Sequence, residues 1–436
     1  MVAPVHEPVR AARTGATRSR RVRTGGVALV LAALALAGGL SGCGTSVRAS
    51  ADVDTAAPGS CGATVLSALG HVAARVYREG IHSERTASAM HMVEDSSALR
   101  AAVQADDAGA ARDAARGLIA TRHLTDLRVV RDGKVLVELG PPAVAPLRGS
   151  LTDTRGRPIA SYVTSVWSTG GLISETSGIA EATTVIRSAR RGGARSVAGS
   201  FPFPAGELPA QGAFTNRGVA YQFTSYPASG YPDGAPLRVY VLRTLGSLGS
   251  LCGSNEDDTT VNTLSRIAHH IYEGEAGRRT GEQIRRVQAN QALVRAVAQR
   301  DPQATRSAIE ALLHQHIVRL RVSAGGRLLS DVGGPFVLAP VTAPLRQGSH
   351  TVGSFVLSIQ DDEGYKRLAN RLVGLDVLMY MGSRLVKSTV GSPPRPIPTS
   401  GRVTLRGHNY HAYTFRAEAF PSGPLRVTVL IPLPYS

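Results

Sequence analysis

Residues 316–362 read HIVRLRVSAGGRLLSDVGGPFVLAPVTAPLRQGSHTVGSFVLSIQDD, and this stretch decides the fold. Apolar and polar residues alternate along it, and Gly-Gly pairs and prolines interrupt the alternation where the backbone has to bend. The pattern predicts a strand, a tight turn, a second strand, a loop that contains prolines, and a further strand.

Nearly the same text occurs about 193 residues earlier in the chain. The two copies start at His123 and His316, and they keep the same spacing as far as Ser165 and Ser358. A repeat of this length is the size of a whole domain and is too long for the unit of a solenoid. The sequence therefore predicts a tandem duplication with two hydrophobic cores, which 436 residues that are 43% apolar can bury.

Helices precede the strands in both copies. Apolar residues recur at spacings of three and four over about 64–104 and again over 261–297, and a shorter helix follows each stretch at about 108–120 and 302–313. A helix of about 35–40 residues cannot bury its full length on one small sheet. We therefore expect part of it to pack on the other repeat or on a second copy of the chain, as a homodimer.

The helix expected after these strands differs between the copies. Asp361-Asp362 supplies an N-cap for a Leu-rich helix over 363–373, whereas the Ser, Thr and Gly residues of 168–184 predict a short helix or none. The fold class expected is α+β. Two tandem domains, 61–252 and 257–436, would each consist of a long N-terminal helix and a mostly antiparallel sheet.

The first 42 residues have the features of a lipoprotein signal peptide. An Arg-rich segment precedes the apolar run 27–40, which is short for a membrane span but usual for a signal peptide. The run ends in Leu40-Ser41-Gly42-Cys43, which resembles the lipobox of bacterial lipoproteins. We therefore expect a lipid on Cys43, a flexible tether over 43–60, and a location on the outer face of the cytoplasmic membrane. An uncleaved anchor is the alternative, and the export route, Sec or Tat, stays open.

The charge of the chain does not indicate nucleic-acid binding. The formal net charge is +17, and residues 1–42 hold six Arg and one Glu, so their removal leaves +12. The remaining basic residues form no block of five or six and are not interleaved with aromatic residues. A weak preference for anionic ligands or envelope polymers is the milder interpretation.

Two cysteines remain if Cys43 carries the lipid. Cys61 and Cys252 bracket the first repeat, and an exported protein lies where disulfides persist. We therefore expect a Cys61–Cys252 disulfide rather than a catalytic or metal-binding thiol, because no matching His or second Cys lies nearby in the sequence.

The order of the expected elements resembles that of PAS-like extracytoplasmic sensor domains, the Cache family. Gly326-Arg327-Leu328-Leu329 resembles the turn after the first Cache strand, and the segment from Ala339-Pro340-Val341 to Val356 resembles the proline segment that leads to a Gly-started strand. Because each repeat has its own long helix, the chain resembles two single-Cache units rather than one double-Cache domain. The resemblance implies that the protein binds a small ligand such as a carboxylate or an amino acid.

Candidate ligand-binding side chains lie on or near the predicted strands of the second repeat. Arg321 and Arg346 are cations that can pair with a carboxylate, and His350, Ser358 and Tyr410 can hydrogen-bond. The matching positions of the first repeat, a weaker candidate, are Arg128, Ser165 and Tyr221. Each has a plainer interpretation. An Arg can cover a sheet with its stem, a loop residue can simply be solvated, and a hydroxyl can satisfy a core contact.

No pattern in the sequence indicates catalysis, a metal or a cofactor. The histidine pairs lack the helical spacing with a Glu that zinc enzymes show; they are His269-His270, His314/His316 and His408/His411. Asp361 and Asp362 are adjacent and point apart, and an N-cap role explains one of them. No nucleophile elbow or phosphate loop occurs. We therefore expect a protein that is not an enzyme.

Two functions remain open. The first is an extracytoplasmic lipoprotein that binds a small anionic metabolite in the second repeat; since no kinase or membrane helix follows the last strand, it would act with a separate signalling or transport protein. The second is a structural or protein-interaction lipoprotein whose Cache-like domains have lost their pockets. The sequence leaves open the ligand, the partner and the oligomeric state.

Overall fold

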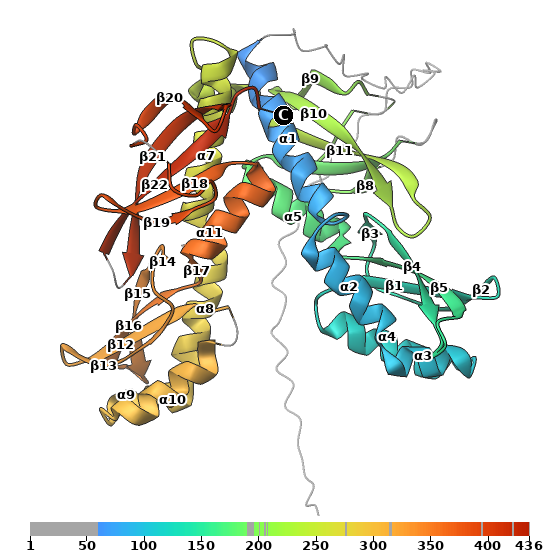
Figure 1. Cartoon of the computed structure of the whole chain (residues 1–436), viewed down its shortest axis with the longest axis horizontal. Helices are drawn as coiled ribbons and strands as arrows, with labels where there is room; N and C mark the ends of the chain where they lie inside the picture. The colour runs from blue at the N-terminus through green and yellow to red at the C-terminus, as the bar shows by residue number, and fades with distance from the viewer. Residues whose placement is uncertain are drawn as a thin grey trace, which may run out of the picture. The chain divides into compact units, whose positions relative to one another are not determined.

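The computed structural model describes residues 60–189, 196–199, 201–204, 206, 208–274, 277–313, 316–393, 396–420 and 423–435 (Figure 1). The expected signal peptide, Cys43 and the tether up to residue 59 lie outside these residues. The described part is α+β and duplicated, and its order of helices and antiparallel strands is the one that the Cache resemblance implies, so the predicted fold class is confirmed. Within this part, no helix is both long and apolar enough to span a membrane.

Each repeat opens with four helices. In the first repeat they are α1 (Cys61–Glu79), α2 (Glu84–Glu94), α3 (Ser97–Gln104) and α4 (Ala108–Ala120). In the second they are α7 (Glu256–Gly274), α8 (Arg278–Ala289), α9 (Gln291–Ala298) and α10 (Pro302–Leu313). Each repeat thus begins with a long helix, as expected, but α1 and α7 span 19 residues each and not the 35–40 residues that the apolar pattern predicted. Ser83 forms a capping box with Thr86, and Ser96 and Asn290 also cap new helices, so polar caps interrupt a continuous apolar pattern.

The strands of the first repeat form two sheets. The small sheet has the order β2-β1-β5-β4, and the large sheet has the order β6-β3-β10-β11-β7-β8 with β9 beside β10. Their bounds are β1 (Asp126–Arg131), β2 (Lys134–Leu139), β3 (Ala143–Val144), β4 (Leu147–Thr152), β5 (Pro158–Ser165), β6 (Trp167–Ser168), β7 (Thr183–Ser188), β8 (Ser196–Ala198), β9 (Gln211–Asn216), β10 (Val219–Gly230) and β11 (Ala235–Thr244). Helix α6 (Leu245–Leu248) and a 3-10 turn, Gly249–Leu251, lead to the second repeat.

The second repeat has the same two sheets. The small one is β13-β12-β16-β15, and the large one is β17-β14-β21-β22-β18-β19 with β20 beside β21. The bounds are β12 (Arg319–Ala324), β13 (Arg327–Gly333), β14 (Val337–Leu338), β15 (Val341–Gln347), β16 (His350–Ser358), β17 (Gln360–Asp361), β18 (Asp376–Met381), β19 (Arg384–Ser388), β20 (Ser400–Leu405), β21 (His408–Phe420) and β22 (Gly423–Pro432).

Both sheets of a repeat follow one strand order. In the small sheet, β1 pairs with the next strand, β2, and with the last strand, β5; in the large sheet, β7 pairs with β8 and with the last strand, β11. Each repeat therefore contains two sheets of one pattern, where the sequence analysis expected a single sheet and a single-Cache unit. β3 and β14, two residues each, lie in the chain between strands of the small sheet but pair in the large sheet, and so short a segment has no recognisable strand pattern in the sequence.

A helix precedes the later strands in both repeats. It is α5 (Thr169–Ala180) in the first repeat, and α11 (Asp362–Leu368) followed by a π-helical turn, Ala369–Val373, in the second. The expectation of a short or absent helix over 168–184 is wrong. Ser168 caps α5, and Leu172 and Ile179 are buried in the core, so tertiary packing outweighs the low helix propensity of its Gly, Ser and Thr residues.

The two repeats share one hydrophobic core. Helices α1 and α7 lie side by side in Figure 1, and their apolar faces belong to a single cluster with the π-helical turn Ala369–Val373. Ion pairs also cross between the repeats, from Arg266 to Glu181 at 3.2 Å and from Arg371 to Glu79. The expected packing of the first helix on the neighbouring repeat is thus observed.

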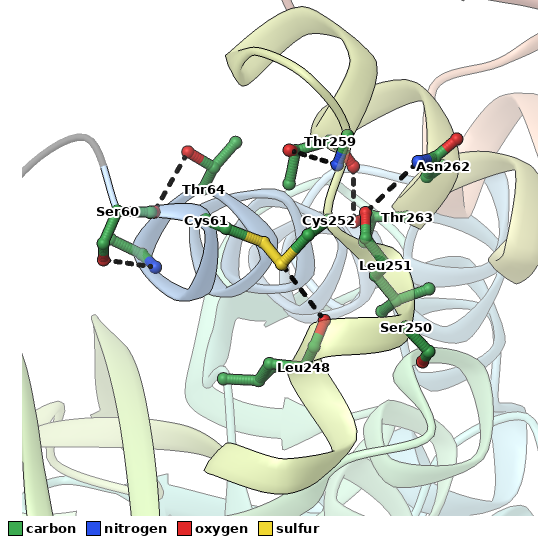
Figure 2. Close-up of a disulfide and its surroundings, with 12 residues drawn as sticks. Ser60, Cys61, Thr64, Leu248, Ser250, Leu251, Cys252, Thr259, Asn262 and Thr263 are labelled. Carbon is green, nitrogen blue, oxygen red and sulfur yellow. Dashed lines mark hydrogen bonds between the residues drawn. A yellow bond between two sulfur atoms is a disulfide. The ribbon is translucent and has the colours of Figure 1, made fainter.

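A disulfide joins Cys61 and Cys252, as the sequence predicted, with their Cα atoms 5.5 Å apart (Figure 2). Cys61 is the first residue of α1, and Cys252 follows the 3-10 turn that ends the first repeat. The backbone N–H of Gly253 donates to Thr259 Oγ1 at 2.9 Å. The bond therefore fixes the start of α1 beside the start of α7.

Candidate functional site

The ligand-binding residues expected in the second repeat do not form one site. Arg346 and His350 are exposed at the hairpin between β15 and β16, whereas Ser358 is the last residue of β16. Eight residues of strand separate His350 from Ser358, which is about 26 Å at 3.3 Å per residue. One small ligand cannot contact both ends of this strand.

The two matching serines connect the sheets within each repeat. Ser358 is buried, and its hydroxyl donates to the backbone oxygen of Leu338 on β14; Ser165 is also buried and donates to Val144 on β3. These hydrogen bonds join the end of the small sheet to the start of the large one. Both hydroxyls therefore satisfy core contacts.

The two matching tyrosines lie on the large sheets. The Tyr410 hydroxyl on β21 donates to Asp376 Oδ2 at 3.1 Å, and burial followed by the Asp376 charge raises its pKa. Tyr221 belongs to an aromatic cluster and lies 4.9 Å from Phe201 between ring centroids. Neither tyrosine lies on the sheet that carries Arg321 or Arg128.

Arg321 already holds a carboxylate of its own chain. Its Nε and Nη2 donate to Asp331 Oδ2 at 2.9 and 2.7 Å, while Arg319 Nε donates to Asp331 Oδ1 at 2.8 Å. Both guanidinium groups lie over the Phe420 ring, 5.2 Å from its centroid for Arg319 and 4.8 Å for Arg321. Burial raises the pKa of Asp331, but the hydrogen bonds from the two arginines outweigh burial and leave that pKa lowered.

A pocket of about 550 Å³ lies between the two sheets of the first repeat. The end of β2 and the residues that follow it form one side, and the turn between β10 and β11 forms another. Its wall includes Asp126, Glu138, Gly140, Tyr231 and Val197. None of these residues was among the candidates from the sequence.

Asp126 is the notable group of this pocket. It is 2% exposed, and its Oδ2 has no hydrogen-bond partner among the residues that the structure describes. Burial and, to a smaller extent, the charge of Glu138 together raise its pKa to about 6, against a hydrogen bond from Thr125 that lowers it. Gly140 has a φ of +126°, and a Cβ there would lie 2.2 Å from Asp126 Oδ1, so only glycine leaves room for this carboxylate.

The other charged groups near Asp126 are acidic or already paired. Arg128 lies 3.6 Å from a Glu138 oxygen and 3.4 Å from Asp233. Tyr231 donates its hydroxyl to the backbone oxygen of Val163 at 3.1 Å, and burial and the Asp126 charge raise its pKa. The pocket therefore presents two carboxylates, Asp126 and Glu138, beside an aromatic ring.

A second pocket, of about 310 Å³, lies where α5 meets α7 and α11. Its charged residues pair across it, with Arg279 Nη2 3.2 Å from Glu175 and His270 Nδ1 3.1 Å from Glu181. These contacts satisfy its polar groups within the chain, so the pocket of the first repeat is the stronger candidate.

One signal in the sequence could have identified Asp126. The offset of 193 residues that matches Arg128 with Arg321 also matches Asp126 with Arg319, a reversal of charge at one position of the duplication. This position is not among the residues that the two repeats share, because its residue differs between them.

No known family model matches the chain, and no curated protein matches it. Among solved structures it is similar to the periplasmic domain of LuxQ from Vibrio cholerae, at 12% identity over 39% of this chain and 98% of that one, with a TM-score of 0.28. It is also similar to an extracellular ligand-binding receptor from Desulfohalobium retbaense, at 12% identity over 42% of this chain and 39% of that one (TM-score 0.24).

A third similar structure is the ligand-binding domain of the Pseudomonas aeruginosa amino acid chemoreceptor PctB in complex with L-Arg, at 13% identity over 39% of this chain and 95% of that one (TM-score 0.23). The first of these structures is described as a periplasmic domain and the second as an extracellular receptor. At these TM-scores the likeness carries no inference about function.

Proposed function

We propose that the chain is an extracytoplasmic sensor lipoprotein that binds a small ligand in its first repeat and acts with a separate signalling or transport protein. The observation that carries this proposal is the pocket between the sheets of that repeat, with the buried Asp126 in its wall, whose Oδ2 has no hydrogen-bond partner among the described residues. Its volume of about 550 Å³ lies within the range of small-molecule sites, roughly 300–1,000 Å³.

A buried carboxylate without a partner destabilises a folded protein, because the charge loses its hydration and gains no hydrogen bond. Perturbed acidic groups in pockets are therefore a sign of function. Asp126 fits this description at one oxygen: Thr125 hydrogen-bonds the carboxylate, but its Oδ2 has no partner among the described residues. In the second repeat the matching position is Arg319, whose charge is fully paired.

The second repeat supports the other candidate function, an interaction or structural role. Its ion-pair cluster of Arg319, Asp331 and Arg321 packs against Phe420 at the place that corresponds to the pocket. A ligand carboxylate held by Arg321 would have to displace Asp331. Binding through Arg346 and His350 stays a prediction, and their exposed hairpin gives it less support than the pocket of the first repeat.

The membrane anchor and the partner are also part of the proposal. They rest on the lipobox-like sequence that ends in Cys43 and on the resemblance to sensor domains. A lipid on Cys43 would hold the tether and both repeats at the membrane surface, where a membrane-spanning partner can contact them.

A thermal-shift screen of the full chain in detergent against amines, amino acids, carboxylates and purines tests the proposal. A ligand at 100 times its Kd adds about 2.7 kcal/mol of stability, a shift of a few degrees. Val197→Trp would fill part of the pocket and abolish the shift. Val135→Trp is the matched control, because both valines are nearly half exposed, at 47% and 46%, but only Val197 lines the pocket. A screen without any hit, or a hit that Val197→Trp leaves unchanged, would contradict the proposed site.

A further inference from the structure

The small sheets of the two repeats can be superimposed residue by residue through their hydrogen-bond register. Asp126 pairs with Ser165 on β5, and Arg319 pairs with Ser358 on β16. The next glycines also match, since Gly140 and Gly333 have φ values of +126° and +135°. Asp126 and Arg319 therefore occupy one and the same position of the duplicated sheet.

The neighbours of this position match as well. Arg128 pairs with Glu138 across the hairpin, and Arg321 pairs with Asp331. Ser165 and Ser358 donate to the backbone oxygens of Val144 and Leu338, so these two acceptors occupy equivalent positions. In the large sheets Val144 pairs with Gly230, and Leu338 pairs with Ala419. Gly230 therefore matches Ala419, and the next residue, Tyr231, matches Phe420. The two repeats thus place a carboxylate and an aromatic ring around the same point.

In the second repeat a guanidinium occupies this point. Arg319 donates to the Asp331 carboxylate at 2.8 Å and to the backbone oxygens of Gly334 and Gly333 at 2.6 and 3.3 Å, and its flat group lies over the Phe420 ring. A carboxylate, carbonyl oxygens and a ring face are the groups that bind a guanidinium. The second repeat carries this cation on its own side chain.

In the first repeat the same surroundings lack that cation. Asp126, a second carboxylate, occupies the position that is equivalent to Arg319, and it lines the pocket. We propose that the pocket of the first repeat binds the guanidinium or ammonium group of a small cationic ligand between Asp126, Glu138 and the Tyr231 ring. This inference rests on the proposed function and names the chemical class of its ligand.

The positive charge expected of the ligand distinguishes this proposal from binding of an anionic or a neutral ligand. A purely anionic ligand would meet two carboxylates, and a neutral ligand would leave the Asp126 charge without a partner. The proposal is thus opposite in charge to the anionic metabolite expected for the second repeat. A zwitterion such as an amino acid would have to place its ammonium group, and not its carboxylate, next to Asp126.

Calorimetry of the full chain in detergent, at pH 7.5 and low salt, tests the proposal with butylguanidine and with butylurea, its neutral isostere. We expect saturable binding of butylguanidine at least tenfold tighter than that of butylurea. Asp126→Asn should weaken butylguanidine at least tenfold, and Glu138→Gln should weaken it several-fold. Val135→Trp, away from the pocket, is the control and should bind as the unchanged chain does.

Equal affinity for the two probes, or full affinity in both carboxylate variants, would overturn the proposal. If Asp126→Asn fails to fold, Glu138→Gln alone decides, because Glu138 is half exposed. The proposed function has a separate test. A neutral or anionic ligand from the screen whose shift Val197→Trp abolishes would refute the cationic ligand and leave the binding function intact, whereas a screen without any ligand would remove both.

Discussion

Asp126 and Arg319 stand at the same position of a duplicated strand and carry opposite charges. Each pairs across its small sheet with a buried serine, and each lies opposite a glycine in the left-handed region of φ. The guanidinium of Arg319 is held by Asp331 and by backbone oxygens, whereas Asp126 lines a pocket with one carboxylate oxygen unpaired. After the duplication, one repeat has an internal ion-pair cluster at this position, and the other has a pocket with a buried carboxylate in its wall.

Asp126→Asn should stabilise the free protein at neutral pH. Burial raises the pKa of Asp126 to about 6, so the folded chain binds this proton more tightly than the unfolded chain does. The stability of the native chain should then decrease as pH rises through about 6, and the variant should lack this decrease. We expect a gain on the order of 1 kcal/mol at pH 7.5.

Urea unfolding at pH 5 and pH 7.5 measures this effect. The charged and titratable groups near Asp126 are Glu138 and Tyr231, with Arg128 paired to Glu138 and Asp233, and the substitution leaves all of them in place. Equal stability of the two chains at pH 7.5 would show that the carboxylate is solvated or paired there.

Asp331→Asn should destabilise the second repeat by about 2–4 kcal/mol, because it leaves two guanidinium groups without their carboxylate. The pKa of Asp331 is lowered in the folded chain, so its contribution is present above about pH 4 and is lost as pH falls further. The difference between variant and native chain should stay constant from pH 5 to pH 8 and shrink below pH 4.

Glu138→Gln is the matched control, since Glu138 is the equivalent residue of the first repeat and its side chain is 49% exposed against 13% for Asp331. We expect it to change stability by less than about 1 kcal/mol. Similar losses of stability in both variants would mean that the cluster of Arg319, Asp331 and Arg321 stabilises the protein no more than the Arg128–Glu138 pair does.

Replacing both Cys61 and Cys252 by Ser should lower the free energy of unfolding by about 2–4 kcal/mol, because the bond restricts the unfolded chain over a long loop. Denaturant unfolding measures the loss. A non-reduced digest of protein from the native envelope should contain the linked peptides. Recovery of both cysteines as free thiols would contradict the disulfide.

Cys43→Ser should release the protein from the detergent phase of membrane extracts or block its processing, because a single lipidated residue would carry the anchor. The Cys61/Cys252 double variant is the control and should stay in the detergent phase. Unchanged partitioning and size of the Cys43→Ser chain would exclude lipidation at this residue.

The segment 257–436, expressed alone, should melt cooperatively but at a lower temperature than the whole chain. Without the first repeat, α7 exposes the apolar face that packs on α1, and Arg371 loses Glu79. Calorimetry of the segment, alone and mixed with 61–252, measures this. A segment that is unfolded alone would show that the two repeats are one folding unit.

Local chemistry specifies several elements of this chain, and these could be predicted from the order of its residues. The alternation of apolar and polar residues, interrupted by glycine and proline, predicted the strands of the small sheets. The similarity of two segments 193 residues apart predicted the duplication. The Cys61–Cys252 disulfide could be predicted because the protein is expected to be exported and has only two cysteines besides Cys43, which bracket the first repeat. These features depend on neighbouring residues or on simple counting.

The position of the pocket depends on how distant segments pack, and no local pattern predicts it. Two-residue strands, β3 and β14, join the sheets through the hydroxyls of Ser165 and Ser358, and no local pattern shows such a crossing. Whether a charge is free or paired depends on residues far apart in sequence, such as Arg319 and Phe420. The pairing of Arg321 with Asp331 and the unpaired oxygen of Asp126 follow from that three-dimensional arrangement, because the free energy of a charge is set by its surroundings.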